Sequence, residues 1–527
     1  MDVVVVGAGF SGLYMLHKLR ELGLSAVAFE TALDVGGTWY WNRYPGARCD
    51  VESMSYSYSF SPELEQEHEW TERFATQPEI LRYANHVADR FGLREDIRFG
   101  TRVTHARYDG HSRTWRVRTD RGDDVTARFL VMATGCLSAA KLPEIPGIGS
   151  FRGPAYHTAR WPHEGVDFTG LRVGLIGTGS SGVQSIPVIA EQAAELTVFQ
   201  RTPAYSYPAR NRPLERGEID GMKARYPQWR QAQRESRAGI PWPPPAQSAL
   251  EVSAAERTAT FEKAWNSGVL TAMTASYNDI ATNMAANDTL RHFFHGKVGE
   301  IVTDPRTAAD LCPDYPAATK RPCLDTGYFE AYNRDNVRLV NLRRTPLAAI
   351  TEGGVATSER DYEFDAIVYA TGFDAMTGAL RSIDIRGRDG VSLAEQWRVG
   401  PRTYLGIASA GFPNLFLITG PGSPSVLTNM LVSIEQHVDW ITDALAYLGS
   451  RGLAAIEPTR QAQDAWVAHV NEIAAQTLYP KANSWYMGAN VPGKPRVFMP
   501  YAGGIPAYRA TCEEVAGNGY EGFTLSA

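Results

Sequence analysis

The sequence lacks several features that define whole classes of protein. No apolar stretch reaches the length of about 18 residues that a membrane-spanning helix needs. The five cysteines form no C-x-x-C pair, which argues against a disulfide framework or a zinc site and favours a reducing compartment. No long basic run is present and the formal net charge is −6, so nothing favours binding to nucleic acid.

An export signal is also missing from the beginning of the sequence. Met1 is followed almost at once by the apolar run VVVV, without the charged, apolar and small-residue regions of a signal peptide. We therefore expect a soluble cytoplasmic protein, a monomer or weak homo-oligomer, with neither nucleic acid nor a membrane as its partner. The 527 residues, 44% of them hydrophobic, are enough for about two or three globular units.

What is present begins with a glycine-rich turn between a strand and a helix. The four valines predict a strand buried on both faces, and Gly7, Gly9 and Gly12 follow with the spacing G-x-G-x-x-G. The next apolar run ends on Glu30, where an acid binds a ribose hydroxyl while the helix N-terminus binds the pyrophosphate. The alternative is a tight turn that uses glycine for backbone reasons alone.

The same pattern recurs in LRVGLIGTGSSGVQS. Gly177, Gly179 and Gly182 repeat the spacing, but the strand that follows ends in Arg201 and Thr202 instead of an acid. A guanidinium and a hydroxyl favour a 2′-phosphate, which an acid would repel. We therefore expect FAD or NAD at the first loop and NADP at the second. The alternative for Arg201 is a surface arginine without a ligand.

Two dinucleotide folds in one chain indicate a flavoprotein that receives electrons from NADPH. We predict an α/β protein with two Rossmann-like dinucleotide-binding domains, one for FAD and one for NADP, and a helical insertion. Residues 1–136 and 374–527 are assigned to the FAD-binding domain and residues 137–198 and 317–373 to the NADP-binding domain. The Arg-, Glu-, Ala- and Gln-rich residues 199–316 are assigned to the helical insertion.

A third motif lies between the two glycine loops. Phe151, Gly153, His157, Trp161 and Pro162 form F-x-G-x-x-x-H-T-x-x-W-P just before the second loop. Taken alone, the histidine could be a catalytic base, a metal ligand or part of a joint between the domains. The motif resembles the signature of Baeyer–Villiger monooxygenases, the FAD- and NADPH-dependent class.

Three further segments resemble the same enzymes, especially the phenylacetone and steroid monooxygenase branch. They are GGTWYWNRYPGARCD (36–50), KRPCLDTGYFEAYNRDNVRLV (320–340) and SWYMGANVPGKPR (484–496). The resemblance implies that reduced flavin captures O2 as a C4a-peroxide, which attacks a ketone. The adduct then rearranges to an ester or lactone and the second oxygen leaves as water. Sulfoxidation is an expected side activity.

The same sequence features bear on three other functions. A related flavin monooxygenase that oxygenates nitrogen or sulfur centres is the main alternative. A catalytically silent flavoprotein acting as a redox sensor would be expected to lack Arg321 or Asp50, and both are present. A disulfide reductase would need a pair of cysteines after the first glycine loop, and that pair is absent.

The resemblance implies a catalytic role for Arg321. Its charge would stabilise the peroxide and the oxyanion, because a guanidinium stays protonated at any working pH. Asp50 would face Arg321 and orient it, and an interdomain salt bridge is the structural alternative for the pair. Trp485 would lie against the nicotinamide, with a core tryptophan as its alternative. His157 would then belong to the joint between the domains.

The remaining assignments also come from the resemblance. FAD would contact Gly7, Gly9, Ser11, Gly12, Glu30, Thr38, Trp39, Tyr40, Trp41, Asp50, Tyr56, Val103 and Met430. NADP would contact Arg48, Gly177, Thr178, Gly179, Ser180, Ser181, Gly182, Gln184, Arg201, Thr202, Lys320, Arg321 and Trp485. The ketone would contact Ser425, Val426, Leu427 and Met430 in the loop GPGSPSVLTNM.

Three local patterns are interpreted without a catalytic role. Cys136 follows an ATG turn and is predicted to be a small buried residue. Ser180 and Ser181 lack the G-x-S-x-G frame of a nucleophile elbow. His292 and His295 have a spacing that suits a metal, but no supporting carboxylates accompany them, so we expect no metal site.

Overall fold

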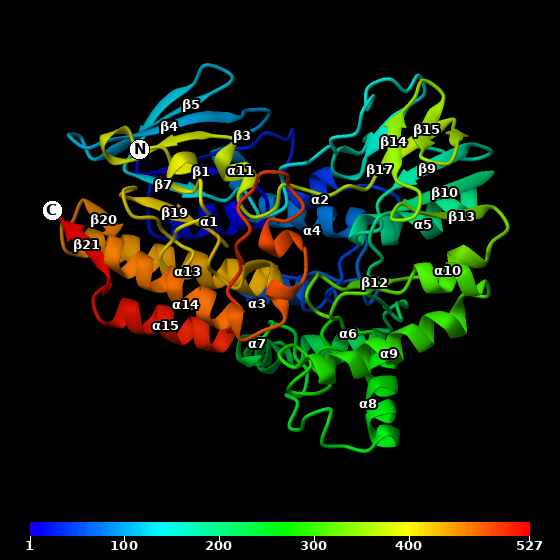
Figure 1. The fold of residues 1–527 in the computed structure, drawn as a ribbon. Coiled ribbons are helices and arrows are strands. Elements are labelled where there is room, and N and C mark those ends of the chain that lie inside the picture. Colours follow the sequence, from blue (N-terminus) through cyan, green and yellow to red (C-terminus); the bar gives the residue numbers. More distant parts are fainter.

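The computed structural model describes all 527 residues, which form two α/β units side by side above a helical region (Figure 1). The first unit is built on a parallel sheet with the strand order β19-β7-β1-β2-β3. Its strands are β1 (Val3–Val6), β2 (Ala26–Phe29), β3 (Ile97–Arg98), β7 (Phe129–Met132) and β19 (Leu415–Leu417).

The glycine loop of this unit connects β1 to α1 (Phe10–Glu21). All four valines of β1 are buried, and Gly7 then adopts a φ of +108°, which favours glycine. A Cβ on Gly7 would lie 2.5 Å from the Ala133 carbonyl oxygen, so the first ATG turn packs directly on the loop. On the other side, α1 packs against α13 (Met430–Ser450).

Further helices surround the first unit. α13, α14 (Arg460–Ala475) and α15 (Ile505–Gly517) lie together beneath its sheet (Figure 1). The others are α2 (Thr38–Trp41), α3 (Pro62–Glu67) and α4 (Gln77–Arg90). None of the helices combines the length and the apolar composition that a membrane crossing requires.

The second unit repeats the arrangement of the first. Its parallel sheet has the order β13-β10-β9-β17-β8. The glycine loop connects β9 to α5 (Ser180–Gln192), which continues through Pro187 without a break. The strands are β8 (Ala155–His157), β9 (Arg172–Ile176), β10 (Glu195–Gln200), β13 (Val337–Asn341) and β17 (Ala366–Tyr369). The predicted fold class, with two Rossmann-like domains, is confirmed.

Smaller sheets decorate both units. The first unit carries β4 (Val103–Asp109), β5 (Thr114–Thr119), β6 (Asp124–Ala127) and β18 (Asp384–Arg386), and the pair β20 (Ala455–Pro458) and β21 (Phe523–Ser526) near the C-terminus. The second unit carries the antiparallel strands β14 (Leu347–Ile350), β15 (Gly354–Thr357) and β16 (Asp361–Glu363).

The chain passes between the two units twice, in residues 133–154 and 370–383, which we call the crossing segments. They are antiparallel neighbours, because Ala140 and Phe373 form a β-bridge. Lys141 N donates to Gly372 O at 3.1 Å, and Asp374 N donates to Ala139 O at 2.9 Å. The predicted domain boundaries near 136 and 373 both fall in these segments and stay predictions.

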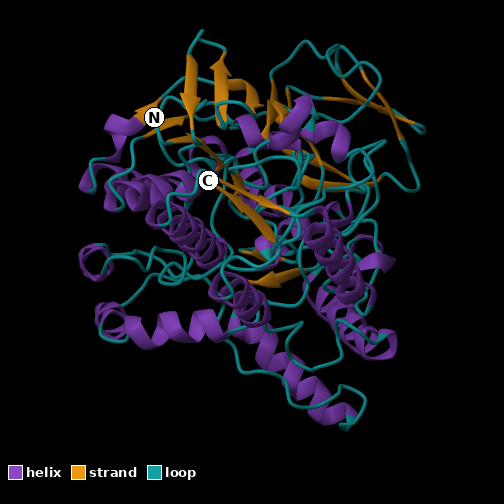
Figure 2. Cartoon of the chain, turned by 90° about the vertical axis from the view of Figure 1, so that its left-hand side faces the viewer, coloured by secondary structure: helices purple, strands orange, loops and turns teal.

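The predicted insertion contains most of the helical region. Its helices are α6 (Arg216–Lys223), α7 (Tyr226–Glu235), α8 (Ala254–Ser267), α9 (Met284–Ile301) and α10 (Pro305–Asp310). Before them, β10 continues to Gln200, past the predicted boundary at 198. The short strand β11 (Ser206–Pro208) pairs with β12 (Cys323–Asp325). Figure 2 shows most strands in the upper part of the molecule and most helices below them.

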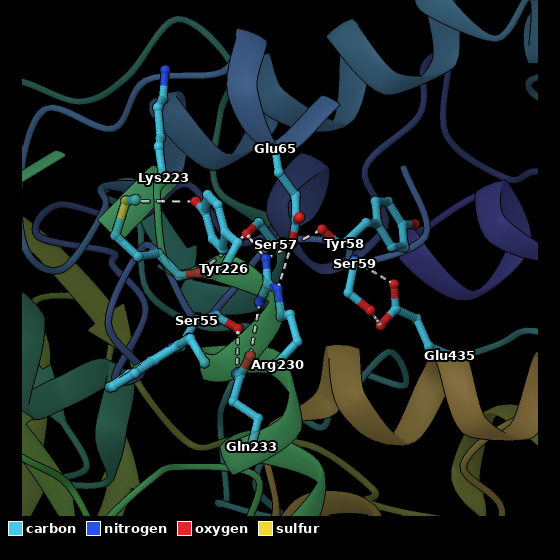
Figure 3. Close-up of polar contacts among 12 residues, drawn as sticks. Ser55, Ser57, Tyr58, Ser59, Glu65, Lys223, Tyr226, Arg230, Gln233 and Glu435 are labelled. Carbon is cyan, nitrogen blue, oxygen red and sulfur yellow. Dashed lines mark hydrogen bonds and ion pairs between the residues drawn. The ribbon is translucent and has the colours of Figure 1, made fainter. Parts of the chain in front are cut away.

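A buried ion pair joins α7 to the first unit (Figure 3). Arg230 Nε donates to Glu65 Oε1 of α3 at 2.7 Å, and the two side chains are only 6% and 8% exposed. The guanidinium also donates to Ser57 Oγ at 2.7 Å and to Gln233 Oε1 at 2.9 Å. A fourth contact runs from the guanidinium to Tyr58 O at 3.2 Å. Together the four contacts of this buried arginine fix the position of α7.

Candidate active site

Arg321 and Asp50 meet where the two units face each other. Arg321 Nη2 lies 2.7 Å from Asp50 Oδ1, and Arg321 Nε lies 3.1 Å from Asp50 Oδ2. Nη2 also donates to Asp50 Oδ2 at 2.8 Å, and Nη1 donates to the Val426 carbonyl oxygen at 2.8 Å. Burial lowers the pKa of the Arg321 guanidinium, but the charge and hydrogen bonds of Asp50 act against it, and the pKa stays above its ordinary value. Arg321 therefore stays a fixed cation.

An apolar cluster lies beside this cation. It contains Val426 of the predicted ketone loop, and Leu427, Met430 and Trp485 pack against it partly buried. The hydroxyl of Ser425, in contrast, faces the protein interior, where it contacts other polar groups. Three of the four residues predicted to contact the ketone thus lie in one apolar cluster beside Arg321.

Tyr486 is a member of this cluster that the sequence interpretation did not single out. It is 2% exposed, and burial raises the pKa of its phenol while the charge of Arg321 opposes that rise. In the sequence, the only indication that Tyr486 lies near the site is that it follows Trp485 in SWYMG. Residue type and spacing alone gave no sign of it.

The first nucleotide site has the features expected for FAD. Gly9 precedes α1, and no side chain caps that helix, so its first amide groups are free to bind a pyrophosphate. A Cβ on Gly9 would lie 3.3 Å from Gly37 Cα, which shows how closely α2 approaches the loop. Glu30 Oε2 accepts from Ala8 N at 2.7 Å, which holds its carboxylate beside the loop. Burial raises the pKa of Glu30.

The other residues predicted to bind FAD are spread around this loop. Ser11 is buried in the first turn of α1, and Thr38, Trp39, Tyr40 and Trp41 form α2. Trp39 Nε1 donates to Tyr56 OH at 3.3 Å. Val103 begins β4 and belongs to the same apolar cluster as Phe29, the neighbour of Glu30. Met430 begins α13.

The second glycine loop presents the N-terminus of α5 in the same way. Gly177 has a φ of +111° and packs on Ala370 of the second ATG turn. A Cβ on Gly179 would meet nothing within 4 Å, and no side chain caps α5. Thr178 Oγ1 donates to Thr202 O at 3.0 Å, which ties the loop to the end of β10. Nearby, Gly182, Ser180 and Ser181 begin the helix.

Cations gather beside this second loop. Neither Arg201 nor Lys320 has a carboxylate within 4 Å, and Lys320 Nζ lies 4.5 Å from the centre of the Tyr315 ring. Burial, together with the charges of Arg201 and Arg343, lowers the pKa of Lys320 to about 8. Arg201 and Lys320, two positive groups without a carboxylate partner of their own, suit an anionic ligand.

Arg343 was missed by the sequence interpretation. Its Nε donates to the Arg201 carbonyl oxygen at 3.0 Å, and its Nη1 pairs with Asp314 at 2.6 Å. It stands just after β13, two strands from the glycine loop. The arginine pair in NLRRT was visible in the sequence, but nothing there placed it beside Arg201.

Gln184 and Arg48 lie where the two units touch. Tyr44 OH donates to Gln184 Oε1 at 2.8 Å, and Gln184 Nε2 donates to Arg48 O at 3.0 Å. Gly46 has a φ of +78° and a Cβ there would collide with the Gln184 carbonyl. The Arg48 side chain pairs with Glu72 at 2.9 Å.

His157 lies on β8 beside both crossing segments. Its Nδ1 accepts from Ala159 N at 3.1 Å, so Nε2 carries the proton. Nε2 lies 3.1 Å from Lys141 O and 3.2 Å from Thr371 Oγ1. Burial lowers the pKa of His157, which keeps the ring neutral. The ring therefore bridges the two crossing segments.

The rest of this motif has a packing environment. Trp161 is 4% exposed, and Pro162 is half-buried. A Cβ on Gly153 would lie 2.7 Å from the Phe151 ring, so only glycine leaves room for that ring.

His292 and His295, whose spacing suits a metal, lie in different environments. His292 is exposed, whereas His295 Nε2 bonds to Pro313 O at 2.9 Å. No group of three or more His, Cys, Asp or Glu side chains is arranged to hold a metal ion.

Two nucleotide folds facing one half-buried cation define a class of protein: an oxidoreductase in which a nicotinamide nucleotide and a flavin nucleotide meet across a domain interface. Comparison with known proteins narrows this class. Residues 1–207 match the family model FMO-like, described as flavin-binding monooxygenase-like.

Three curated relatives match along nearly the whole chain. A Baeyer–Villiger monooxygenase of Pseudooceanicola batsensis is 45% identical over 523 residues, 98% of this chain and 95% of that protein. Cyclohexanone 1,2-monooxygenase of Acinetobacter sp. is 43% identical over 527 residues, 99% of this chain and 96% of that protein. A phenazine N-monooxygenase of Lysobacter antibioticus is 42% identical over 527 residues, with 99% and 97% covered.

Solved structures agree with these relatives. Oxidized steroid monooxygenase bound to NADP is 55% identical, with a TM-score of 0.96 and coverage of 100% of this chain and 99% of that one. The protein OTEMO in complex with FAD and NADP is 42% identical, with a TM-score of 0.97 and the same coverage. This chain belongs to the Baeyer–Villiger monooxygenase family of flavin-dependent monooxygenases. The predictions of family, monooxygenase activity and FAD and NADP as cofactors are confirmed.

Proposed function

We propose that this enzyme inserts one oxygen atom from O2 next to the carbonyl group of a ketone and releases an ester or a lactone, with NADPH as the electron donor. Bound FAD supplies the redox chemistry that activates O2. The observation that carries the proposal is Arg321, a cation held by Asp50 and by the Val426 carbonyl against an apolar cluster.

Arg321 answers the electrostatic demand of this reaction. Negative charge is present on the attacking oxygen and develops on the ketone oxygen, and a preorganised cation stabilises both. Asp50 orients the fork through three bonds, from Nε and Nη2, and leaves Nη1 directed at the Val426 carbonyl. An arginine cannot readily give its proton to the attacking oxygen, which must stay anionic to act as a nucleophile.

The proposed cofactor contacts follow from the two glycine loops. FAD would bind across the N-terminus of α1, with its ribose hydroxyls on Glu30. NADP would bind across the N-terminus of α5, with its 2′-phosphate on Arg201, Thr202 and Lys320. The domain boundaries given above belong to the same proposal.

The proposed substrate is an aryl or bulky cyclic ketone. The steroid monooxygenase structure is 55% identical to this chain, and the apolar groups of Val426, Leu427, Met430 and Trp485 offer no partner for a charged substrate. A panel of ketones of increasing size, with products identified by mass, tests this. Faster turnover of small aliphatic ketones would refute the preference.

Replacement of Arg321 tests the proposed reaction directly. Arg321→Ala should keep anaerobic flavin reduction by NADPH, but ester formation should fall by about 10²–10³-fold because the charge is lost. Arg321→Lys keeps the charge without the bidentate fork and should be intermediate. Ester formation by Arg321→Ala at the parental rate would contradict the role of the cation.

Oxygenation of nitrogen is a second candidate, because the phenazine N-monooxygenase shares 42% of its residues over nearly the whole length. Sulfoxidation is proposed as a side activity. An assay that offers a bulky ketone, a phenazine and an aryl sulfide to the same preparation separates these functions. A higher kcat/KM for the phenazine than for every ketone would replace the main proposal by the second.

We further propose a cytoplasmic enzyme, a monomer or weak homo-oligomer that acts on a small molecule and O2. All five cysteines are free, which suits a reducing compartment. Light scattering at several concentrations tests the state of association, and a stable dimer at low concentration would contradict it.

A further inference from the structure

One of the hydrogen bonds that hold Arg321 is made to a backbone carbonyl group. The bond from Nη1 ends on the carbonyl oxygen of Val426, so the Val426 side chain does not determine it. The position of that oxygen is set by the turn Ser425–Leu427, directly after Pro424. The direction in which the fork points therefore depends on what holds this turn.

The turn contains a residue in an unfavourable conformation. Ser425 is fully buried and has a φ of +43°, in the left-handed region that residues other than glycine seldom occupy. Such a conformation persists only where the surroundings impose it, and it is common beside functional sites.

Two polar side chains impose it. Ser425 Oγ donates to the Thr419 carbonyl oxygen at 3.1 Å and lies 3.0 Å from Cys136 Sγ. Cys136 Sγ lies 3.2 Å from the same carbonyl oxygen. Cysteine, serine and carbonyl thus form a closed triangle. Burial raises the pKa of the thiol, so Cys136 keeps the proton that it donates here.

Further hydrogen bonds from the protein interior hold Thr419, the residue that contributes the carbonyl group of the triangle. Thr419 has a φ of +55°, and its N–H donates to Nδ1 of the buried His437 at 2.9 Å. His437 Nε2 then donates to Tyr508 OH at 2.8 Å, and Tyr508 OH donates to the carbonyl of Leu405. A chain of hydrogen bonds therefore runs from the core of the first unit to the turn beside Arg321.

We infer that Cys136 and Ser425 are positioning residues that set the direction of the Arg321 guanidinium by holding the Val426 carbonyl in place. This inference deepens the proposed function and rests on it for the role of Arg321. It assigns Cys136 more than the space-filling role that its size and burial suggest. Cys136 is contributed by the first crossing segment, so the triangle also joins that segment to the ketone loop.

A pair of substitutions at Cys136 separates hydrogen bonding from packing. Cys136→Ser and Cys136→Ala remove nearly the same volume, but only serine keeps a donor. Coupling is the ratio of ester formed to H2O2 released. In Cys136→Ala this ratio should fall about fivefold, the effect of one hydrogen bond. Cys136→Ser should retain most of the coupling. Anaerobic flavin reduction by NADPH should stay within about twofold in both.

A second pair tests the backbone conformation. Ser425→Ala and Ser425→Gly both remove the hydroxyl, but glycine adopts a positive φ without strain. Ser425→Gly should therefore stay better coupled than Ser425→Ala. This pair decides the question where Cys136→Ala does not fold. Cys312→Ala and Cys312→Ser, at a half-buried thiol after α10, are the matched controls and should match the parent enzyme.

The crystal structures of the Cys136 variants give a readout that does not depend on turnover. The bond from Arg321 Nη1 to Val426 O should be present in Cys136→Ser and lost or lengthened in Cys136→Ala. Equal coupling in the two variants, or an intact bond in Cys136→Ala, would overturn the inference. An unmodified enzyme that forms no ester would instead refute the proposed function and leave this comparison of structures in force.

Discussion

At the scale of single residues, Lys320 is the proposed cofactor ligand whose charge changes nearest to working pH. Burial and the charges of Arg201 and Arg343 lower its pKa to about 8. A 2′-phosphate binds the protonated amine, so affinity for NADP+ should be full below pH 8 and should fall as pH rises through that value. We expect up to about tenfold weaker binding per pH unit above it.

Two variants act as controls for this titration, measured by calorimetry between pH 6.5 and 9.5. Lys320→Arg keeps its charge over the whole range and should remove the pH dependence. Arg201→Ala should lower the affinity for NADP+ at every pH and reduce the preference for NADPH over NADH. A parent enzyme with constant affinity across the range would contradict the role of Lys320.

Single residues also show where prediction from sequence ends. Arg201, Lys320, Arg321 and Asp50 stand in motifs with recognisable spacing, and the last two prove to be paired. The contact between Cys136 and Ser425 joins residues far apart in the chain, and Ser425 adopts its positive φ without a glycine to announce it. Such contacts depend on how distant segments pack, which no local pattern records.

At the scale of elements, the ion pair between α7 and α3 makes a prediction about stability (Figure 3). Arg230→Met should destabilise the enzyme by about 3–5 kcal/mol, because Glu65 is left as a buried charge without its partner. Burial already raises the pKa of Glu65 despite the charge of Arg230. Without Arg230 the carboxylate protonates more readily, so the loss should be smaller at pH 5 than at pH 8.

Chemical denaturation of the holoenzyme at both pH values measures this effect. The matched control is Arg230→Met combined with Glu65→Leu, which removes both charges and should recover most of the lost stability. A double variant as unstable as the single one would mean that the remaining contacts of Arg230, to Ser57 and Gln233, account for the stability.

Elements differ in how well the sequence announces them. The two glycine loops, with their flanking strands and helices, were predictable because buried valines, glycine spacing and helical periodicity coincide there. The edge strand β8 was hidden inside the Phe151–Pro162 motif, because three residues are too few for a periodic signal. The sheet of β4, β5 and β6 is joined by β18 from a distant part of the chain, and no local pattern predicts that pairing with β4.

At the scale of the whole molecule, we predict that His157 couples the two units without taking part in the chemistry. His157→Ala removes the bond to the Lys141 carbonyl and should slow both flavin reduction and ester formation about tenfold. His157→Gln keeps a donor and an acceptor and should be less affected. FAD content and NADP+ affinity should stay within about twofold of the parent.

Stopped-flow reduction and product analysis over a range of pH check this prediction. Burial lowers the pKa of His157 and the ring is already neutral, so the pH profile of His157→Ala should keep the shape of the parent profile. A profile that loses one limb would instead mean that His157 transfers a proton.

The pairing of the two crossing segments has a mechanical consequence. Joined by the bridge between Ala140 and Phe373 and the hydrogen bonds beside it, they form a short two-stranded strap between the units. A strap bends easily out of its own plane and resists shear within that plane. We therefore expect the two units to open and close by a hinge motion about one axis. Each closure would return the nicotinamide side of the interface to the same lateral position over the flavin side.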